Sequence, residues 1–325
     1  MARRTEIRAF DLFCGAGGSS CGARMAGATP VGGIDLWPTA IETYGLNFPG
    51  AKTWRRRIER LSAKQVARAV GKIDLLLASP ECTNHSVAKG NAPRCEYSRR
   101  TAFEVIRFAK ALQPRWLIVE NVVAMRRWHS YREWRERLET LGYNLIEAVL
   151  DSHGFGVSQR RKRLFVIGDN KKVPCAPLPF RNPKATVKAI LTTSDTDGTP
   201  WVFSRLNSPN RAKPTLERAN RAIQHLGRKK PFLIVYYGSD GAGGWQSLDR
   251  PLRTITTLDR FALVKPNDSG HLLRMLQPSE LAAAMGFPCD YQWPAVPRRC
   301  RIKLVGNAVS PPVIKAIVQQ LIKSS

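Results

Sequence analysis

The stretch Asp11-Leu12-Phe13-Cys14-Gly15-Ala16-Gly17-Gly18 decides the fold class of this 325-residue chain. A strand-like apolar run at residues 9–13 leads through its glycines into a segment of helical period at residues 18–26. Glycine permits a tight turn and lets a ligand approach the bare backbone there. The pattern therefore predicts a ligand-binding turn between a strand and a helix. A purely structural tight turn is the other interpretation.

The alternation of strand-like runs and helical segments continues from residue 8 to about residue 168. The predicted strands lie at residues 9–13, 31–35, 74–78, 116–120, 145–150 and 164–167, and the predicted helices at residues 18–26, 38–47, 99–112 and 131–141. Such an alternation is typical of an α/β fold in which helices cover both faces of a parallel sheet.

The pattern changes after residue 169, where the sequence becomes rich in Pro, Ser, Thr and Asn. Further strands are expected at residues 232–237 and 254–257, separated by a glycine-rich loop at 238–244, and helices at 278–285 and 312–322. We therefore predict a main domain of residues 1–169 plus 304–325, a second domain of residues 170–262, and a hinge or connecting region of residues 263–303.

The chain is strongly basic, with 52 Lys and Arg against 25 Asp and Glu and a net charge of +27. This excess points to a polyanionic partner. Two stretches, residues 52–72 and 205–230, each hold eight basic residues and one acid, and both are interpreted as phosphate-facing surfaces. A solvated face that keeps the chain soluble is the alternative. No apolar run approaches the roughly 20 residues that span a bilayer, and the first residues lack a secretory signal.

Cysteine usage indicates a reducing compartment. The seven cysteines are an odd number without C-x-x-C spacing, which argues against a disulfide framework and against a zinc site, so no metal is expected. Cys82 differs from the others because it lies in a polar loop that follows a buried strand at residues 74–78.

Polar groups gather where predicted strands end. Asp35 ends the second strand, the loop with Cys82 follows the third, and Glu120 ends the fourth. Ligand and catalytic groups collect at the carboxyl edge of open α/β sheets. An acid about twenty residues after the glycines suits ribose hydroxyls, although a helix N-terminal acid is the alternative for Asp35. An extended segment at residues 159–163 would add Gln159, Arg161 and Arg163 on one face.

The order of these motifs resembles that of the carbon-5 cytosine DNA methyltransferase family. The matching segments are residues 10–18, 33–35, 80–86, 120–122, 159–163, 250–256 and 306–309, so the resemblance covers nearly the whole chain. It implies a Rossmann-like S-adenosylmethionine-dependent methyltransferase sheet with a smaller target-recognition domain. It also implies S-adenosylmethionine as the cofactor, double-stranded DNA as the substrate and a DNA (cytosine-5-)-methyltransferase activity.

The resemblance and the chemistry together give three sets of expected site residues. The catalytic set is Cys82, Glu120, Arg161, Arg163 and Gln159. The cofactor-binding set is Phe13, Gly15, Gly17, Gly18, Asp35, Pro80, Asn307 and Val309, although Asn307 is also interpreted as a buttress between the domains. The DNA-binding set is Ser86, Lys89, Arg253 and Thr254. The side chains that read bases within residues 170–244 stay unassigned.

The expected chemistry begins with covalent activation, because carbon 5 of cytosine is a poor nucleophile. The thiolate of Cys82, favoured by Arg161 and Arg163, adds to carbon 6 while a protonated Glu120 steadies N3 of the ring. Carbon 5 then takes the methyl group. Since no side chain reaches these atoms inside a duplex, the cytosine must be everted.

Departures from the family pattern leave alternatives open. The family usually has Pro-Cys-Gln around the nucleophile, where this chain has Glu81-Cys82-Thr83, and residues 54–58 offer no acid for the adenine. The alternatives are an RNA cytosine-5 methyltransferase and a non-catalytic DNA-binding protein of the same fold. The remaining expectations are a monomer, cytoplasmic in a bacterial or phage-infected cell and nucleoid-associated through DNA, with a cognate restriction endonuclease as a candidate partner.

Overall fold

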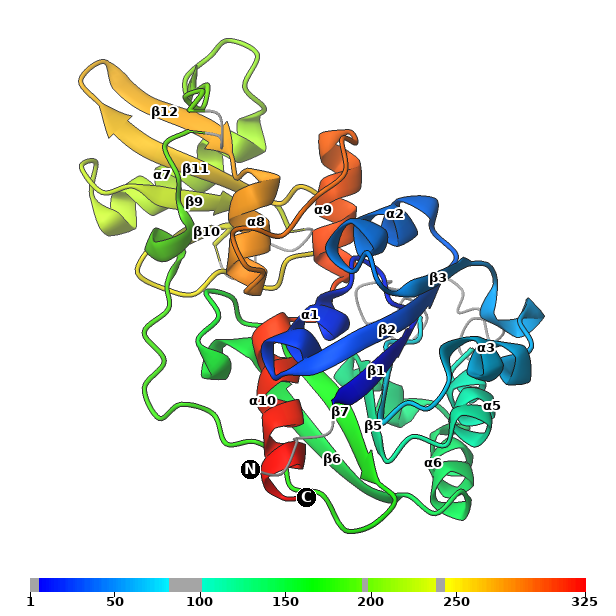
Figure 1. Cartoon of the computed structure of the whole chain (residues 1–325). Helices are drawn as coiled ribbons and strands as arrows, with labels where there is room; N and C mark the ends of the chain where they lie inside the picture. The colour runs from blue at the N-terminus through cyan, green and yellow to red at the C-terminus, as the bar shows by residue number, and fades with distance from the viewer. Residues whose placement is uncertain (1–5, 82–100, 195–197, 238–242) are drawn as a thin grey trace, which may run out of the picture.

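The computed structural model describes residues 6–81, 101–194, 198–237 and 243–325 (Figure 1). Three residues of the expected site, Cys82, Ser86 and Lys89, lie outside the described residues. The remaining expected residues can all be placed.

A seven-stranded sheet of order β3-β2-β1-β4-β5-β7-β6 forms the larger part of the molecule (Figure 1). Its strands are β1 (Ile7–Leu12), β2 (Ala28–Asp35), β3 (Lys52–Arg55), β4 (Leu75–Ala78), β5 (Trp116–Asn121), β6 (Asn144–Asp151) and β7 (Lys162–Asp169). The predicted α/β class is confirmed, but the expectation of a wholly parallel sheet is wrong, since β7 runs antiparallel to β5 and β6. The connection at residues 152–161 is too short for the crossover that a parallel pair requires.

Helices cover both faces of this sheet, as the sequence predicted. One face packs against α1 (Gly18–Met25) and α10 (Pro311–Lys323), and the other against α3 (Ala63–Val70), α5 (Phe103–Leu112) and α6 (Tyr131–Thr140). The strand β4 alternates between the two cores, with Leu75 and Leu77 in one and Leu76 and Ala78 in the other. Burial on both faces explains why this strand is an unbroken apolar run.

A five-stranded antiparallel sheet of order β10-β9-β11-β12-β8 forms the second unit. Its elements are β8 (Ser204–Arg205), α7 (Lys213–Leu226), β9 (Phe232–Val235), β10 (Trp245–Ser247), β11 (Phe261–Asn267) and β12 (Gly270–Met275). The expected division after residue 262 falls within β11, and the strand pairing continues to Met275. The domain boundaries themselves stay a prediction.

The strand expected at residues 254–257 is not formed. Side chains take its backbone groups instead of a neighbouring strand: the Ile255 amide donates to Gln159 Oε1 at 2.7 Å, and the Ile255 carbonyl accepts from Arg161 at 3.1 Å. Several elements were not foreseen, because charged sequence obscures their period. In α3, for example, only Ala63, Val66 and Val70 are buried.

The remaining helices connect the two sheets or flank their strands. They are α2 (Pro38–Asn47), α8 (Pro278–Met285), α9 (Arg298–Asn307), η1 (Ile58–Arg60), η3 (Val123–Arg127), η4 (Ser152–Phe155) and η5 (Val187–Ile190). Both α2 and α8 have the bounds that the sequence predicted. Proline in the first turn makes both starts recognisable.

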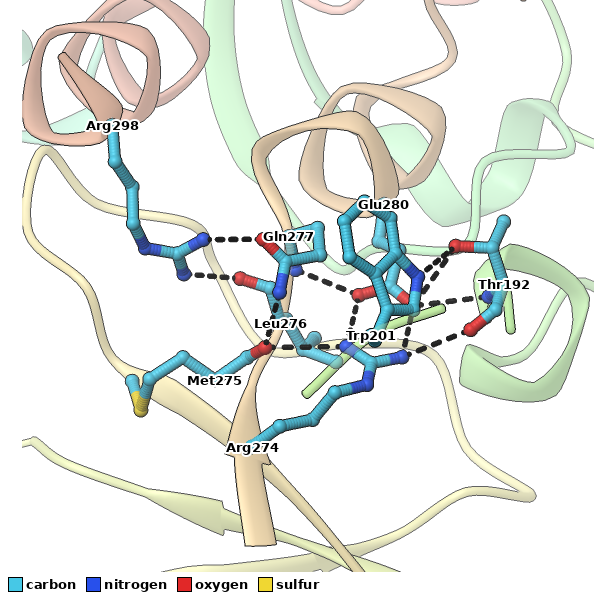
Figure 2. Close-up of polar contacts among 8 residues, drawn as sticks. All are labelled: Thr192, Trp201, Arg274, Met275, Leu276, Gln277, Glu280 and Arg298. Carbon is cyan, nitrogen blue, oxygen red and sulfur yellow. Dashed lines mark hydrogen bonds and ion pairs between the residues drawn. The ribbon is translucent and has the colours of Figure 1, made fainter. Parts of the chain in front are cut away.

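A buried ion pair joins β12 to the start of α8 (Figure 2). Arg274 donates to both oxygens of Glu280, at 2.8 and 2.6 Å, and these side chains are only 2% and 0% exposed. Glu280 also accepts from the Gln277 amide at 2.7 Å and the Thr192 amide at 3.0 Å. The pair therefore fixes the chain where the small sheet leads into the connecting helices, and it links them to the segment before the small sheet.

Removing one partner of this pair should be costly, because the other charge stays buried without compensation. We expect Glu280→Ala to lower the free energy of unfolding by about 3–5 kcal/mol in urea denaturation. The matched control is Glu136→Ala, which removes the exposed ion pair with Arg132 on α6. The control should hardly move the urea midpoint. Equal shifts for both variants would contradict this role for the buried pair.

Candidate active site

The glycine turn after β1 has an unusual backbone. Phe13 lies in the left-handed region at φ 58°, as do Gly15 at 53° and Gly17 at 79°. A bulky residue in this region is strained by about 1–2 kcal/mol, so the surrounding contacts must hold it there. Such strain is concentrated at ligand-binding turns.

Asp35 at the end of β2 supplies two of these holding contacts. Its Oδ2 accepts from the Gly15 amide at 2.9 Å, and its Oδ1 accepts from the Trp37 amide at 2.8 Å. Burial raises the pKa of this carboxyl, and these backbone donors oppose the shift. Asp35 thus holds the turn against β2, and a carboxylate offers about four lone-pair sites, more than its backbone donors use.

The three glycines of the turn differ in what surrounds them. A Cβ on Gly15 would have no heavy atom within 4 Å, whereas one on Gly18 would lie 2.2 Å from the Val309 carbonyl oxygen. A Cβ on Gly17 would meet the Phe48 ring and the Tyr291 hydroxyl at 2.7 Å. Gly17 and Gly18 are therefore required by packing within the protein. Gly15 alone borders open space.

The end of β4 lies against this turn. Ser79 donates from its amide to the Leu12 carbonyl at 3.1 Å and from its hydroxyl to the Phe13 carbonyl at 3.0 Å. The next residue, Pro80, accepts from the Asn121 side chain at 3.1 Å. Two residues before position 82, the chain is thus bonded to the residue that follows Glu120.

Glu120 and Arg163 form an ion pair at the same edge. Their Oε1 and Nε atoms are 3.2 Å apart, and the side chains are 10% and 16% exposed. Burial raises the pKa of Glu120, while the charges of Arg163 and Arg161 oppose that shift. The carboxyl therefore binds a proton more readily than an exposed glutamate does.

Gln159 and Arg161 both contact the segment around residue 255. Arg161 is buried and donates to the carbonyls of Ile255 at 3.1 Å and Gly306 at 3.0 Å. Gln159 accepts from the Ile255 amide and donates to the Met285 sulfur at 2.6 Å. The two side chains connect the large sheet to the segment around residue 255 and to the end of α9.

The other expected residues lie around this junction. Asn307 is the last residue of α9 and is exposed, whereas Val309 is buried against the glycine turn. Arg253 donates to the Trp245 carbonyl at 3.1 Å, and the Thr254 hydroxyl donates to the Arg160 carbonyl at 2.8 Å. Arg253 and Thr254 therefore belong to the segment that bridges the two sheets.

Asp11 was given no role by the sequence, although it opens the motif. It is fully buried and accepts from the Ser20 hydroxyl at 2.8 Å, and the same hydroxyl lies 2.9 Å from that of Tyr44. Its other oxygen has no hydrogen-bond partner among the described residues. Burial raises its pKa from 3.8 to about 7, and the charge of Asp35 adds to the rise. The sequence feature that could have singled out Asp11 is its position directly ahead of the glycine-rich turn.

Asp11 should make stability fall with rising pH. The folded protein binds the proton of the Asp11 carboxyl more tightly than the unfolded chain does. The contribution of this group to the free energy of unfolding is therefore fully present below pH 3.8 and is lost as the pH rises to about 7. We expect Asp11→Asn to remove a slope of at most about 1.4 kcal/mol per pH unit from the unfolding free energy over that window. Urea denaturation at several pH values measures it. Parallel profiles for the two proteins would refute the assignment.

Two kinds of feature are not found among the described residues. These residues contain no group of three or more His, Cys, Asp or Glu that could hold a metal ion. Among the same residues, no helix is long and apolar enough to cross a membrane.

Comparison with known proteins gives a consistent result. The profile of the family described as C-5 cytosine-specific DNA methylase matches residues 7–323. The type II methyltransferase M.HgiDI of Herpetosiphon aurantiacus is 31% identical over 265 residues, which cover 76% of this chain and 80% of that protein. M1.HphI of Haemophilus parahaemolyticus is 29% identical over 97% of this chain and 86% of its own. The structure of the Entamoeba histolytica methyltransferase EhMeth covers 99% of both chains at 16% identity, with a TM-score of 0.71.

Proposed function

The chain belongs to the C-5 cytosine-specific DNA methylase family, and from this premise we propose that it methylates carbon 5 of an everted cytosine in duplex DNA. The resemblance noted in the sequence is thereby confirmed.

The glycine turn suits S-adenosylmethionine, which supplies the methyl group when bound. Open space borders Gly15, and the spare lone pairs of Asp35 can accept hydrogen bonds from ribose hydroxyls. Pro80 follows β4 beside this turn, and its carbonyl accepts a hydrogen bond from Asn121. The expected contacts of Phe13, Asn307 and Val309 belong to the same proposal, with Val309 packed on Gly18.

Cys82 is the proposed nucleophile. Its thiolate forms a bond to carbon 6 of the cytosine, and the ring electrons move toward N3. Glu120, whose pKa is raised by burial, holds a proton that it donates toward N3. Carbon 5 then takes the methyl group as the bond from that methyl to the sulfonium sulfur breaks. The proton on carbon 5 passes to water, the bond between carbon 6 and the Cys82 sulfur breaks to restore the thiolate, and the proton on N3 returns to Glu120.

Arg163 has a defined part in this arrangement. At 3.2 Å from Glu120 it restrains the carboxyl, and its remaining donors are available to the carbonyl oxygen on carbon 2 of the base. Gln159 and Arg161 act as positioning residues, since both hold the segment at Ile255. DNA contacts of Ser86, Lys89, Arg253 and Thr254 stay part of the proposal, as does a restriction endonuclease as partner.

The observation that carries the proposal is the bond between Asn121 and Pro80. It joins the residue after Glu120 to the residue two positions before Cys82. The carboxyl ends of β4 and β5 are thereby held together beside the strained turn. This is the arrangement that addition of the sulfur and protonation of the ring require.

Transfer of tritium-labelled methyl groups tests the proposal. We expect label to enter duplex DNA with the unaltered protein and none above background with Cys82→Ser, because the serine hydroxyl is too weak a nucleophile at neutral pH. Glu120→Gln should lower the rate by about 10²–10⁴-fold, since it keeps the hydrogen-bond geometry but loses the proton.

Transfer RNA serves as the alternative substrate in the same assay. Label on RNA but not on DNA would favour the RNA methyltransferase alternative. Label that persists at full rate with Cys82→Ser would overturn the covalent mechanism. The Glu136→Ala variant, altered on the surface of α6, controls for nonspecific losses and should retain the full rate.

A further inference from the structure

The segment from β3 to just beyond α3 carries a dense group of positive charges, for which the described residues supply no carboxylate partner. This surface, called the β3–α3 basic edge, consists of Lys52, Arg55, Arg56, Arg57, Arg60, Lys64, Arg68 and Lys72. All eight are exposed, and Glu59 is the only acid among residues 52–72. The proposed mechanism uses none of them.

These cations lack the compensation seen elsewhere on the molecule. On α6, Arg132 pairs with Glu136 at 2.7 Å and Arg137 with Glu133 at 2.7 Å, one turn apart. Within the described parts of the chain, by contrast, no carboxylate pairs with any member of the basic edge. A surface that only keeps the chain in solution can hold such ion pairs, as α6 does. The described residues provide no such pairs for the β3–α3 basic edge.

Consecutive arginines repel one another, and this cost is removed when an anion lies against them. Arg55, Arg56 and Arg57 follow one another where β3 ends, and their planar guanidinium groups match phosphate oxygens. Lys52 makes one internal bond, to the Ala69 carbonyl, which holds β3 against the end of α3. This bond links the two elements that carry the basic edge.

The second basic stretch, at residues 205–230, is used differently. Arg211 donates to the Ser204 hydroxyl at 2.7 Å and to the Arg205 carbonyl at 3.1 Å, and Arg221 donates to the Gly243 carbonyl at 3.0 Å. Part of that charge therefore stabilises loops of the small sheet. Two stretches with the same number of basic residues therefore differ in how some of their arginines are bonded.

The location of the basic edge sets what it can contact. Figure 1 shows β3 and α3 on the opposite side of the molecule from the small sheet. Arg55 is nevertheless the strand partner of Asp35, so the arginines that begin with Arg55 follow the carboxyl end of the large sheet, which carries the proposed site. Lys52 starts β3, and Lys72 is bonded to Arg8 at the start of β1, so these two lysines lie toward the other end of the sheet. Phosphates held here lie beside the site and beyond the everted base.

We propose that the β3–α3 basic edge binds backbone phosphates of the DNA duplex outside the target site. This inference rests on the proposed function, because it takes DNA as the substrate. The contact would add affinity without reading sequence and would help the protein stay on DNA between targets.

The test compares two variants of equal charge change in the full chain. Arg56→Gln combined with Arg57→Gln removes two charges from the basic edge, and Arg132→Gln combined with Arg137→Gln removes two paired charges from α6. Fluorescence anisotropy measures binding, over a range of salt concentrations, to duplexes of about one and about four helical turns. Methyl transfer is recorded separately.

On the long duplex, the edge variant should lower the slope of log K against log salt by about 2, one phosphate for each arginine, while the α6 variant should leave it unchanged. On the short duplex both variants should match the unaltered protein. Equal slopes for the edge variant and the unaltered protein on the long duplex would overturn the inference. So would an equal loss on the short duplex, which would place the contact inside the target site. A protein that binds DNA in this way but transfers no methyl group would refute only the proposed function.

Discussion

The guanidinium of Arg161 joins segments that lie far apart in the sequence, and the candidate site depends on this junction. It donates to the Ile255 carbonyl and to the Gly306 carbonyl at the end of α9, from a position beside β7. The small sheet and the last helices are thereby held to the edge of the large sheet. Val309, three residues after Gly306, can then lie on Gly18 of the ligand-binding turn. Close approach of this kind is possible only because Gly18 has no side chain.

Burial of carboxyl groups in a strongly basic protein governs the electrostatics of the site. Asp11, Asp35 and Glu120 all have raised pKa values, and burial is the largest cause in each case. The arginines near Glu120 oppose this rise but do not reverse its direction. A net charge of +27 therefore does not lower the pKa of these three carboxyls below the ordinary value, since the basic side chains lie mostly on exposed surfaces.

Much of the fold could be predicted, because helical and strand periods are local properties of the sequence. The turn at residues 11–18, the helix Pro38–Asn47 and the buried strand Leu75–Ala78 were all foreseen. The strand predicted at residues 254–257 is not formed, and no local sequence pattern could have indicated this. Its backbone is hydrogen-bonded by Gln159 and Arg161, about 95 residues earlier in the chain. The antiparallel direction of β7 has a more local cause, because the connection from β6 at residues 152–161 is too short for a parallel crossover.

The sequence by itself determined the family, the turn, and the candidate residues Cys82 and Glu120, because each depends on residue type and order. Only the tertiary structure decided how the residues around them are used. It directed Arg163 to Glu120 and Arg161 to the Ile255 and Gly306 carbonyls, although the two arginines are two residues apart in one motif. It also distinguished two basic stretches of equal composition, because Arg211 and Arg221 of one stretch bond its own loops, whereas all eight basic residues of the other are exposed. The physical reason is that partners come from long-range packing, which composition and spacing do not encode.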